Sequence, residues 1–275
     1  MFDSNSRVRS IESGLLSLKI SELTSSDQLS LMSAIDVLKP NSFVLLLHGL
    51  NRSALETELI NKAGVVLTAT HEMLLEVMKL RSDASAVFAP GAPVRPYRPK
   101  SDCTLLSFGM AHKLRADGYH QLSRLIAADD RSFELHVSTA LHEGGSFDEA
   151  FFTISNDITD VFNGRALFLG FLSDDEISRH LREVSALVAF FEFGVRENNT
   201  TVISAMAHGC PVITNRDSLS PTWMTHNETI FDIASLKHFP TPDELARVGR
   251  NAAEVAQTYN FATLANLIES RIADE

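Results

Sequence analysis

The chain has 275 residues, of which 44% are hydrophobic and 21% are charged, as in ordinary globular proteins. Its formal net charge of −11 disfavours general nucleic-acid binding, which requires a basic surface, and also disfavours docking on an anionic membrane. No apolar run approaches the roughly 18–20 residues that cross a bilayer, and the first ten residues lack the apolar core of a signal peptide. We therefore expect a cytoplasmic protein without an integral membrane segment, in which Cys103 and Cys210 are reduced and buried.

The first 92 residues alternate between helical and strand patterns, which is typical of a parallel α/β fold. Apolar residues recur at helical spacing over residues 8–38, with Ser25-Ser26-Asp27 as a break and a helix N-cap. The segments that follow are a strand over 43–47, a helix over 54–62, a strand over 65–70, a helix over 71–80 and a strand over 86–89. With only about three strands, this lobe is expected to be abbreviated.

A proline-rich segment comes next, with four prolines between residues 90 and 99. This density of proline cannot continue a helix or a central strand, so it marks a domain boundary. We place an N-terminal lobe at 1–92, a stiff hinge connector at 93–100 and a C-terminal lobe at 101–275. The cleft between two such lobes is the expected binding site.

The second lobe repeats the alternation. Its predicted strands cover 104–108, 133–138, 166–169, 186–191, 212–214 and 229–232, and its predicted helices cover 119–127, 148–162, 177–184, 202–208, 243–259 and 261–273. Ser173 and Glu176 have the spacing of a capping box at the start of the third helix.

The stretch 186–214 is the most informative part of the chain. An apolar run over 186–191 indicates a buried strand, and a polar loop follows Gly194. The helix after this loop ends at Gly209, and Pro211 precedes the next strand. The polar loop therefore lies at the carboxyl end of a strand and the amino end of a helix, where doubly wound sheets bind ligands.

Three segments occur in order along the chain: 104–118 with Gly109 at a strand end and a basic loop, 167–177 (LFLGFLSDDEI) and 205–214 (AMAHGCPVIT). Together they resemble the retaining GT-B glycosyltransferases of the group 1 (glycogen-synthase-like) superfamily. The resemblance implies two Rossmann-like lobes that face a cleft, with the acceptor on the N-terminal side and a nucleotide sugar on the C-terminal side. It also implies transfer of the sugar to an acceptor hydroxyl, with retention and without a metal or cofactor, and a glycan or lipid-linked acceptor.

The sequence departs from this family at two positions where the family usually carries glutamate. Arg196 occupies the first position and Ser204, which could still bond a ribose hydroxyl or face the core, occupies the second. Glu192 or Glu197 is a candidate to supply the missing carboxylate.

A nucleotide-sugar reaction needs fixed cations and backbone N–H groups to stabilise the leaving pyrophosphate. Arg196 and Lys113 are the catalytic candidates for this task, and Arg115 and Gly109 are candidates to bind the donor. For Lys113 and Arg115 the alternative is an ordinary solvated loop. His48 resembles a histidine that lies near the donor sugar in many relatives, but a satisfied structural histidine is the alternative at such a strand end.

The polar run after Arg196 supplies the remaining donor-binding candidates. Glu197, Asn198 and Asn199 have the chemistry to bind sugar hydroxyls, although asparagine is also a common helix cap. Thr200 and Thr201 are expected beside the phosphates.

Two other functions remain open alongside the transferase. One is a non-catalytic relative that binds a nucleotide or serves as a partner subunit, which the missing glutamates and short first lobe favour. The other is an epimerase of the same architecture, which would require acidic catalytic residues in the first lobe.

Overall fold

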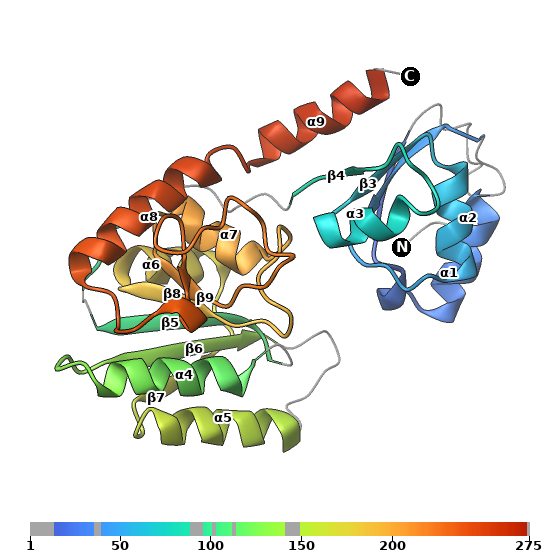
Figure 1. Cartoon of the computed structure of the whole chain (residues 1–275). Coiled ribbons are helices and arrows are strands. Elements are labelled where there is room, and N and C mark those ends of the chain that lie inside the picture. Colours follow the sequence, from blue (N-terminus) through green and yellow to red (C-terminus); the bar gives the residue numbers. More distant parts are fainter. Residues whose placement is uncertain are drawn as a thin grey trace. The chain divides into compact units, whose positions relative to one another are not determined.

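The computed structural model describes residues 14–35, 40–88, 96–100, 103–111, 114–140 and 149–273. The chain forms two compact units, one made of residues 1–88 with 262–275 and the other of residues 89–261. Each unit is built on a parallel sheet with helices packed against it (Figure 1). The predicted α/β class with two sheets is therefore confirmed.

The first unit contains a four-stranded sheet in the order β1-β2-β3-β4, the same order as along the chain. Its elements before the connector are β1 (Gly14–Leu18), the 3₁₀ helix η1 (Ile20–Glu22), α1 (Ser25–Ile35), β2 (Phe43–Leu47), α2 (Ala54–Lys62), β3 (Val65–Thr68), α3 (His71–Val77) and β4 (Ser85–Ala86). Every residue of β2 is buried, as expected for a central parallel strand.

Residues 14–18 form a strand, and the prediction of a helix there is wrong. β1 pairs in parallel with β2, with Leu16 opposite Leu45 and Leu18 opposite Leu47. Leu16 and Leu18 pack against the same core cluster as Ile20, so every second residue faces inward. In so short a leucine-rich segment, the apolar positions fit both a helical and a strand pattern. Pairing with β2 makes the segment a strand.

Helix α9 (Phe261–Ala273) belongs to the first unit from residue 262 onward, whereas the sequence placed residues 101–275 together. Alternate residues of β2 face opposite sides of the sheet. Leu45 and Leu47 pack toward α2, whereas Val44 and Leu46 pack with Leu264, Leu267 and Ile268 of α9. The returning C-terminal helix thus covers the second apolar face of this small sheet.

The second unit contains a six-stranded sheet in the order β10-β9-β8-β5-β6-β7. Its elements are β5 (Thr104–Met110), α4 (Ala116–Ala127), β6 (Glu134–Ala140), α5 (Glu149–Val161), β7 (Ala166–Gly170), α6 (Asp174–Glu183), β8 (Ala186–Ala189), α7 (Thr200–Ala207), β9 (Val212–Thr214), β10 (Phe231–Asp232), the 3₁₀ helix η3 (Ile233–Ser235) and α8 (Pro242–Ala256). Helices α4 and α5 pack on one face, and α6 and α7 pack on the other (Figure 1).

The strand order of this sheet reverses once. From β5 the chain builds outward through β6 and β7, and then returns through α6 to place β8 on the other side of β5. Loops at the carboxyl ends of β5 and β8 therefore diverge to opposite faces, which opens a crevice between them. The two local signals around α6 and α7 are confirmed: Ser173 and Glu176 form a capping box, and Gly209 ends α7 at a φ of 73°.

The described part of the predicted hinge is fastened to the second unit. The amide of Arg98 donates to the Arg182 carbonyl at 2.8 Å, and the amide of Lys100 donates to the Glu183 carbonyl at 2.9 Å. The hydroxyl of Tyr97 donates to the Val184 carbonyl at 3.0 Å. Residues 96–100 are therefore hydrogen-bonded to the end of α6 in this unit, while residues 93–95 lie outside the described part of the chain.

Candidate functional site

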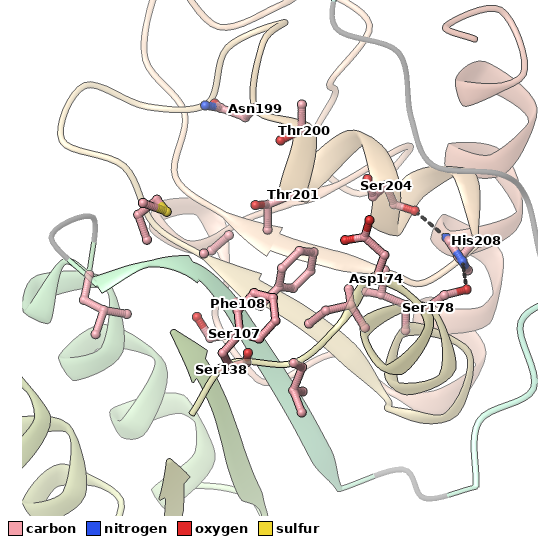
Figure 2. Close-up of a pocket in the computed structure, with 18 of the residues that line it drawn as sticks. Ser107, Phe108, Ser138, Asp174, Ser178, Asn199, Thr200, Thr201, Ser204 and His208 are labelled. Carbon is pink, nitrogen blue, oxygen red and sulfur yellow. Dashed lines mark hydrogen bonds between the residues drawn. The ribbon is translucent and has the colours of Figure 1, made fainter. Parts of the chain in front are cut away.

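A cavity of about 780 Å³ lies in the second unit at the carboxyl ends of β5 and β8. Its walls come from the end of β5, the end of β8, the first turn of α6 and the N-terminal half of α7 (Figure 2). The position is the crevice that the reversed strand order creates. Among the described residues, the lining includes carboxylates, hydroxyls and aromatic rings but no lysine or arginine.

The N-terminus of α7 forms one wall of this cavity. Asn199 is the N-cap residue, and its Oδ1 accepts the Arg196 amide at 2.6 Å. The amides of Val202 and Ile203 both donate to the Asn199 carbonyl, whereas the amide of Thr201 has no acceptor within the described part of the chain. A free N–H at the positive end of a helix dipole attracts an anion.

Gly109 faces this helix terminus from the end of β5. Its φ of 151° is one that side chains rarely adopt, and a Cβ built there would lie 4.0 Å from the Thr201 hydroxyl oxygen with no nearer neighbour. Glycine therefore leaves backbone open to the cavity at the point nearest α7.

A second loop holds the segment before α7 in place. The amide of Val195 donates to the Asn215 carbonyl at 3.0 Å, and the side chain of Asn215 bonds both the amide and the carbonyl of Phe191. Gly194, at a φ of 88°, approaches the backbone of Asp217 so closely that a Cβ would lie 2.9 Å from its nitrogen. The loop after β9 thus fixes where α7 begins.

Arg196 also takes part in these contacts between the segment before α7 and the loop after β9, which we call the loop brace. Its guanidinium donates two hydrogen bonds to the Asp217 carboxylate, each of 2.8 Å, and the residue is buried. Burial alone would raise the pKa of Asp217, but hydrogen bonds from Arg196 and the Leu219 amide lower it below its ordinary value. Arg196 does not line the cavity.

Helix α6 forms the opposite wall and is coupled to α7 through His208. The Nδ1 of this buried histidine lies 2.8 Å from the Ser204 carbonyl, and its Nε2 lies 2.8 Å from the Ser178 hydroxyl (Figure 2). A carbonyl only accepts, so Nδ1–H donates to it and, in the neutral ring, the Ser178 hydroxyl donates to Nε2. His208 consequently ties the two walls together.

The sheet side of the cavity carries satisfied polar groups. The hydroxyls of Ser107 and Tyr119 lie 2.6 Å apart, and burial raises the pKa of Tyr119 to about 12 despite this hydrogen bond. Ser138 donates to the Gly170 carbonyl at 2.9 Å. These groups have partners within the protein and are less available to a ligand than the groups on α6 and α7.

Most of the donor-binding residues expected from the sequence come together here. The six that line the cavity are Gly109, Asn198, Asn199, Thr200, Thr201 and Ser204. Two do not line it: Arg115, whose Nη2 lies 3.5 Å from a Glu192 carboxylate oxygen, and Glu197, whose Oε2 is buried without a hydrogen-bond partner in the described chain.

The other two catalytic candidates are placed differently. Lys113 lies outside the described residues. His48 follows β2 in the first unit, where its Nε2 lies 2.7 Å from the Ser17 hydroxyl. Burial is the main cause that lowers the pKa of His48, with Lys19 acting in the same direction and Glu22 against it.

Sequence reasoning missed the contribution of α6. Asp174, Asp175 and Ser178 line the cavity, but in the sequence the two aspartates have only the appearance of helix-capping residues. The available signal was topological: the crossover from β7 to β8 must pass over β6 and β5, which brings the start of its helix to the crevice.

Within the described parts of the chain, no group of three or more histidine, cysteine, aspartate or glutamate side chains is arranged to hold a metal ion. None of the described helices is both long enough and apolar enough to cross a membrane.

No protein-family model and no curated protein sequence matches this chain. Solved structures do share its fold. HepE from Anabaena, solved with UDP and glucose, is 14% identical with a TM-score of 0.67, and the match covers 90% of this chain and 76% of that chain. Sucrose-phosphate synthase from Thermosynechococcus elongatus is 15% identical with a TM-score of 0.64, over 85% of this chain and 68% of that one. TarM from S. aureus, solved with UDP, is 13% identical with a TM-score of 0.65, over 89% and 54%.

Proposed function

We propose that this chain, which has the fold of the GT-B glycosyltransferases, transfers a sugar from a nucleoside-diphosphate sugar to an acceptor hydroxyl. The observation that carries the proposal is the cavity between β5 and β8, where the N-terminus of α7, with its unpartnered Thr201 amide, and the open backbone of Gly109 both line the wall. A cavity with an anion-binding end and a wall of hydroxyls suits a nucleotide. UDP is present in the structures of HepE and TarM.

The diphosphate would accept hydrogen bonds from the Thr201 amide and from the Thr200 and Thr201 hydroxyls. The α7 dipole favours the charge that develops as the bond to the sugar breaks. Lys113 and Arg115 belong to the loop after β5, and we assign them the balancing positive charge.

We propose that the reaction retains the anomeric configuration. The bond from the sugar C1 to the phosphate oxygen breaks, and a bond from C1 to the acceptor oxygen forms on the same face. The departing phosphate oxygen takes the acceptor proton, so no protein nucleophile is needed. The α7 terminus and the basic loop supply the charge stabilisation, and activity is expected to survive EDTA.

We assign acceptor binding to the first unit, with a glycan or lipid-linked glycan as the acceptor and His48 as a polar contact. His48 is accessible at the end of β2, and its depressed pKa keeps the ring neutral near pH 7. A neutral imidazole can accept a proton from a hydroxyl or bond to it.

A binding protein without turnover is the second candidate, and Arg196 favours it. Two hydrogen bonds to Asp217 hold this guanidinium away from the cavity, so the loop before α7 does not offer it to a leaving phosphate. Under this hypothesis the chain binds a nucleotide without turnover and acts as a subunit of a partner protein.

A thermal-shift panel of UDP, GDP, ADP and CDP, followed by the corresponding nucleotide sugars, tests the proposal. We expect at least one ribonucleoside diphosphate to raise the melting temperature of the wild type and not that of Gly109→Val, whose side chain enters the cavity. Release of nucleoside diphosphate from the matching sugar donor, with the product anomer assigned by NMR, then establishes transfer and retention. Binding without turnover for every donor and acceptor tested would support the second candidate, and no binding at all would exclude both.

A further inference from the structure

The first turn of α6 places a carboxylate in the cavity that the helix does not need for its own cap. Glu176 completes the capping box, since its carboxylate accepts the Ser173 amide at 2.8 Å and the Ser173 hydroxyl at 2.7 Å. Asp174, the first residue of the helix, lines the cavity, is exposed to solvent and has no hydrogen bond or ion pair within the described chain. Its carboxylate is therefore a charged hydrogen-bond acceptor that is available to a ligand.

Asp174 faces α7 across the cavity. In Figure 2 its carboxylate points toward Ser204, whose hydroxyl also lacks a partner among the described residues. Ser204 lies three residues beyond Thr201, which is about 4.5 Å along the helix. If the diphosphate binds at Thr201 and the nucleoside extends along α7, the ribose lies about one helical turn farther on, between Ser204 and Asp174.

A carboxylate at this point would repel the phosphates, because both groups are negatively charged. It is suited to neutral groups that donate. The 2′- and 3′-hydroxyls of a ribose are two adjacent donors, and an ionised carboxylate offers two acceptor oxygens for charge-assisted hydrogen bonds. Acidic side chains hold ribose hydroxyls in the same way in other doubly wound folds.

We propose that Asp174 binds the ribose hydroxyls of the donor nucleotide, with Ser204 opposite, and that the chain therefore selects ribonucleotide donors over 2′-deoxyribonucleotide donors. This inference rests on the proposed function, because it assigns a part of the same cavity. It predicts that thymidine-diphosphate sugars, which lack the 2′-hydroxyl, are poor donors.

Titration calorimetry with UDP, GDP, ADP and CDP and their 2′-deoxy forms tests the assignment on the full chain. We expect the best ribonucleoside diphosphate to bind wild type about 10- to 100-fold more tightly than its 2′-deoxy form, the range of one hydrogen bond to a charged group. For Asp174→Ala the two forms should bind within about threefold of each other, because the charged acceptor is gone.

Asp243→Ala is the matched control, because it removes an exposed carboxylate from the first turn of α8, away from the cavity. It should keep the wild-type ratio of ribonucleotide to deoxyribonucleotide affinity. Melting temperatures without nucleotide show whether both variants fold.

Two results would overturn the ribose assignment while the nucleotide site stands: equal affinity of wild type for both forms, or an unchanged ratio in Asp174→Ala. An unchanged ratio together with an altered base preference would mean that the carboxylate contacts the base. Failure of all four ribonucleoside diphosphates to bind wild type would instead reject the proposed function, and the ribose assignment with it.

Discussion

The two sheets of this protein are both parallel, yet only the second provides the crevice in which we place the nucleotide. The first unit adds its strands in chain order, β1-β2-β3-β4, so successive loops leave the sheet in one sense. The second unit reverses between β5 and β8, and its loops separate there. A ligand site of this kind depends on strand order more than on strand composition, since both sheets have equally apolar central strands.

The polar groups of the two units differ in the same way. In the first unit, the carboxylate of the buried Glu56 accepts hydrogen bonds from the amides of Asn51 and Ser53. In the second, Asp174 and Thr201 line the cavity, and the Asp174 carboxylate and the Thr201 amide have no partners in the described chain. The Glu56 carboxylate is therefore satisfied within the protein, whereas the exposed Asp174 carboxylate is accessible to solvent or a ligand.

The largest effect is expected at the brace of the second unit. Asp217→Ala leaves the buried Arg196 guanidinium without its carboxylate, which should lower the free energy of unfolding by about 3 kcal/mol. Chemical denaturation followed by circular dichroism measures this. The double variant Arg196→Leu/Asp217→Ala should recover part of the loss, because no charge is then left buried.

Full stability of Asp217→Ala together with loss of turnover would give Arg196 a catalytic role in place of the bracing role.

A somewhat smaller effect is expected where α9 covers the first sheet. Leu267→Asp places a charge against Val44 and Leu46 and should destabilise the first unit by about 2 kcal/mol. Hydrogen exchange should accelerate in β2 and β3 but not in β5 and β8. Asn266→Asp adds the same charge at an exposed position of α9 and is the control. Equal acceleration in both sheets would contradict the assignment of α9 to the first unit.

Acid should weaken the brace of the second unit in a defined direction. The pKa of Asp217 in the folded protein lies below its ordinary value of 3.8, so the unfolded chain binds the proton first as pH falls. The carboxylate therefore contributes its stability in full above about pH 4 and loses it as pH falls toward the folded pKa. The difference in melting temperature between wild type and Asp217→Asn should shrink over that range, and a constant difference would show that the charge is not what holds the loop.

The smallest effect is expected from His48 on nucleotide binding. The described residues that line the nucleotide cavity all belong to the second unit and do not include His48, so in His48→Ala the Kd for the nucleoside diphosphate should stay within about twofold of wild type. If the first unit binds the acceptor as proposed, the same variant should raise the KM for the acceptor in transfer assays. A large loss of nucleotide affinity would instead connect His48 to the donor site.

Local patterns predicted much of this structure. The bounds of β2, α2, β9 and α9 agree with the sequence, and the Ser173 capping box and the Gly209 terminus are present. These features depend on residues within one or two turns of each other, so a short window contains the whole physical cause. The sequence also singled out the segment from Asn198 to Ser204, which lines the cavity at the start of α7, because a strand end followed by a helix start is visible locally.

Other features depend on partners far along the chain. Gly14–Leu18 is a strand because β2 offers it an edge, and α9 completes the first unit because β2 presents a second apolar face. Arg196 was expected to face a phosphate, but Asp217, 21 residues later, holds it in the loop brace. Asp174 reaches the cavity only because α6 crosses back over the sheet.

By itself, then, the sequence determined the alternation of elements, their caps and the polar segment that borders the cavity. The tertiary structure decided which strands are neighbours, which unit contains α9, and which charged side chains line the cavity. The physical reason is that propensity and capping act over a few residues, whereas burial and ion pairing are settled only when distant segments compete for the same surface.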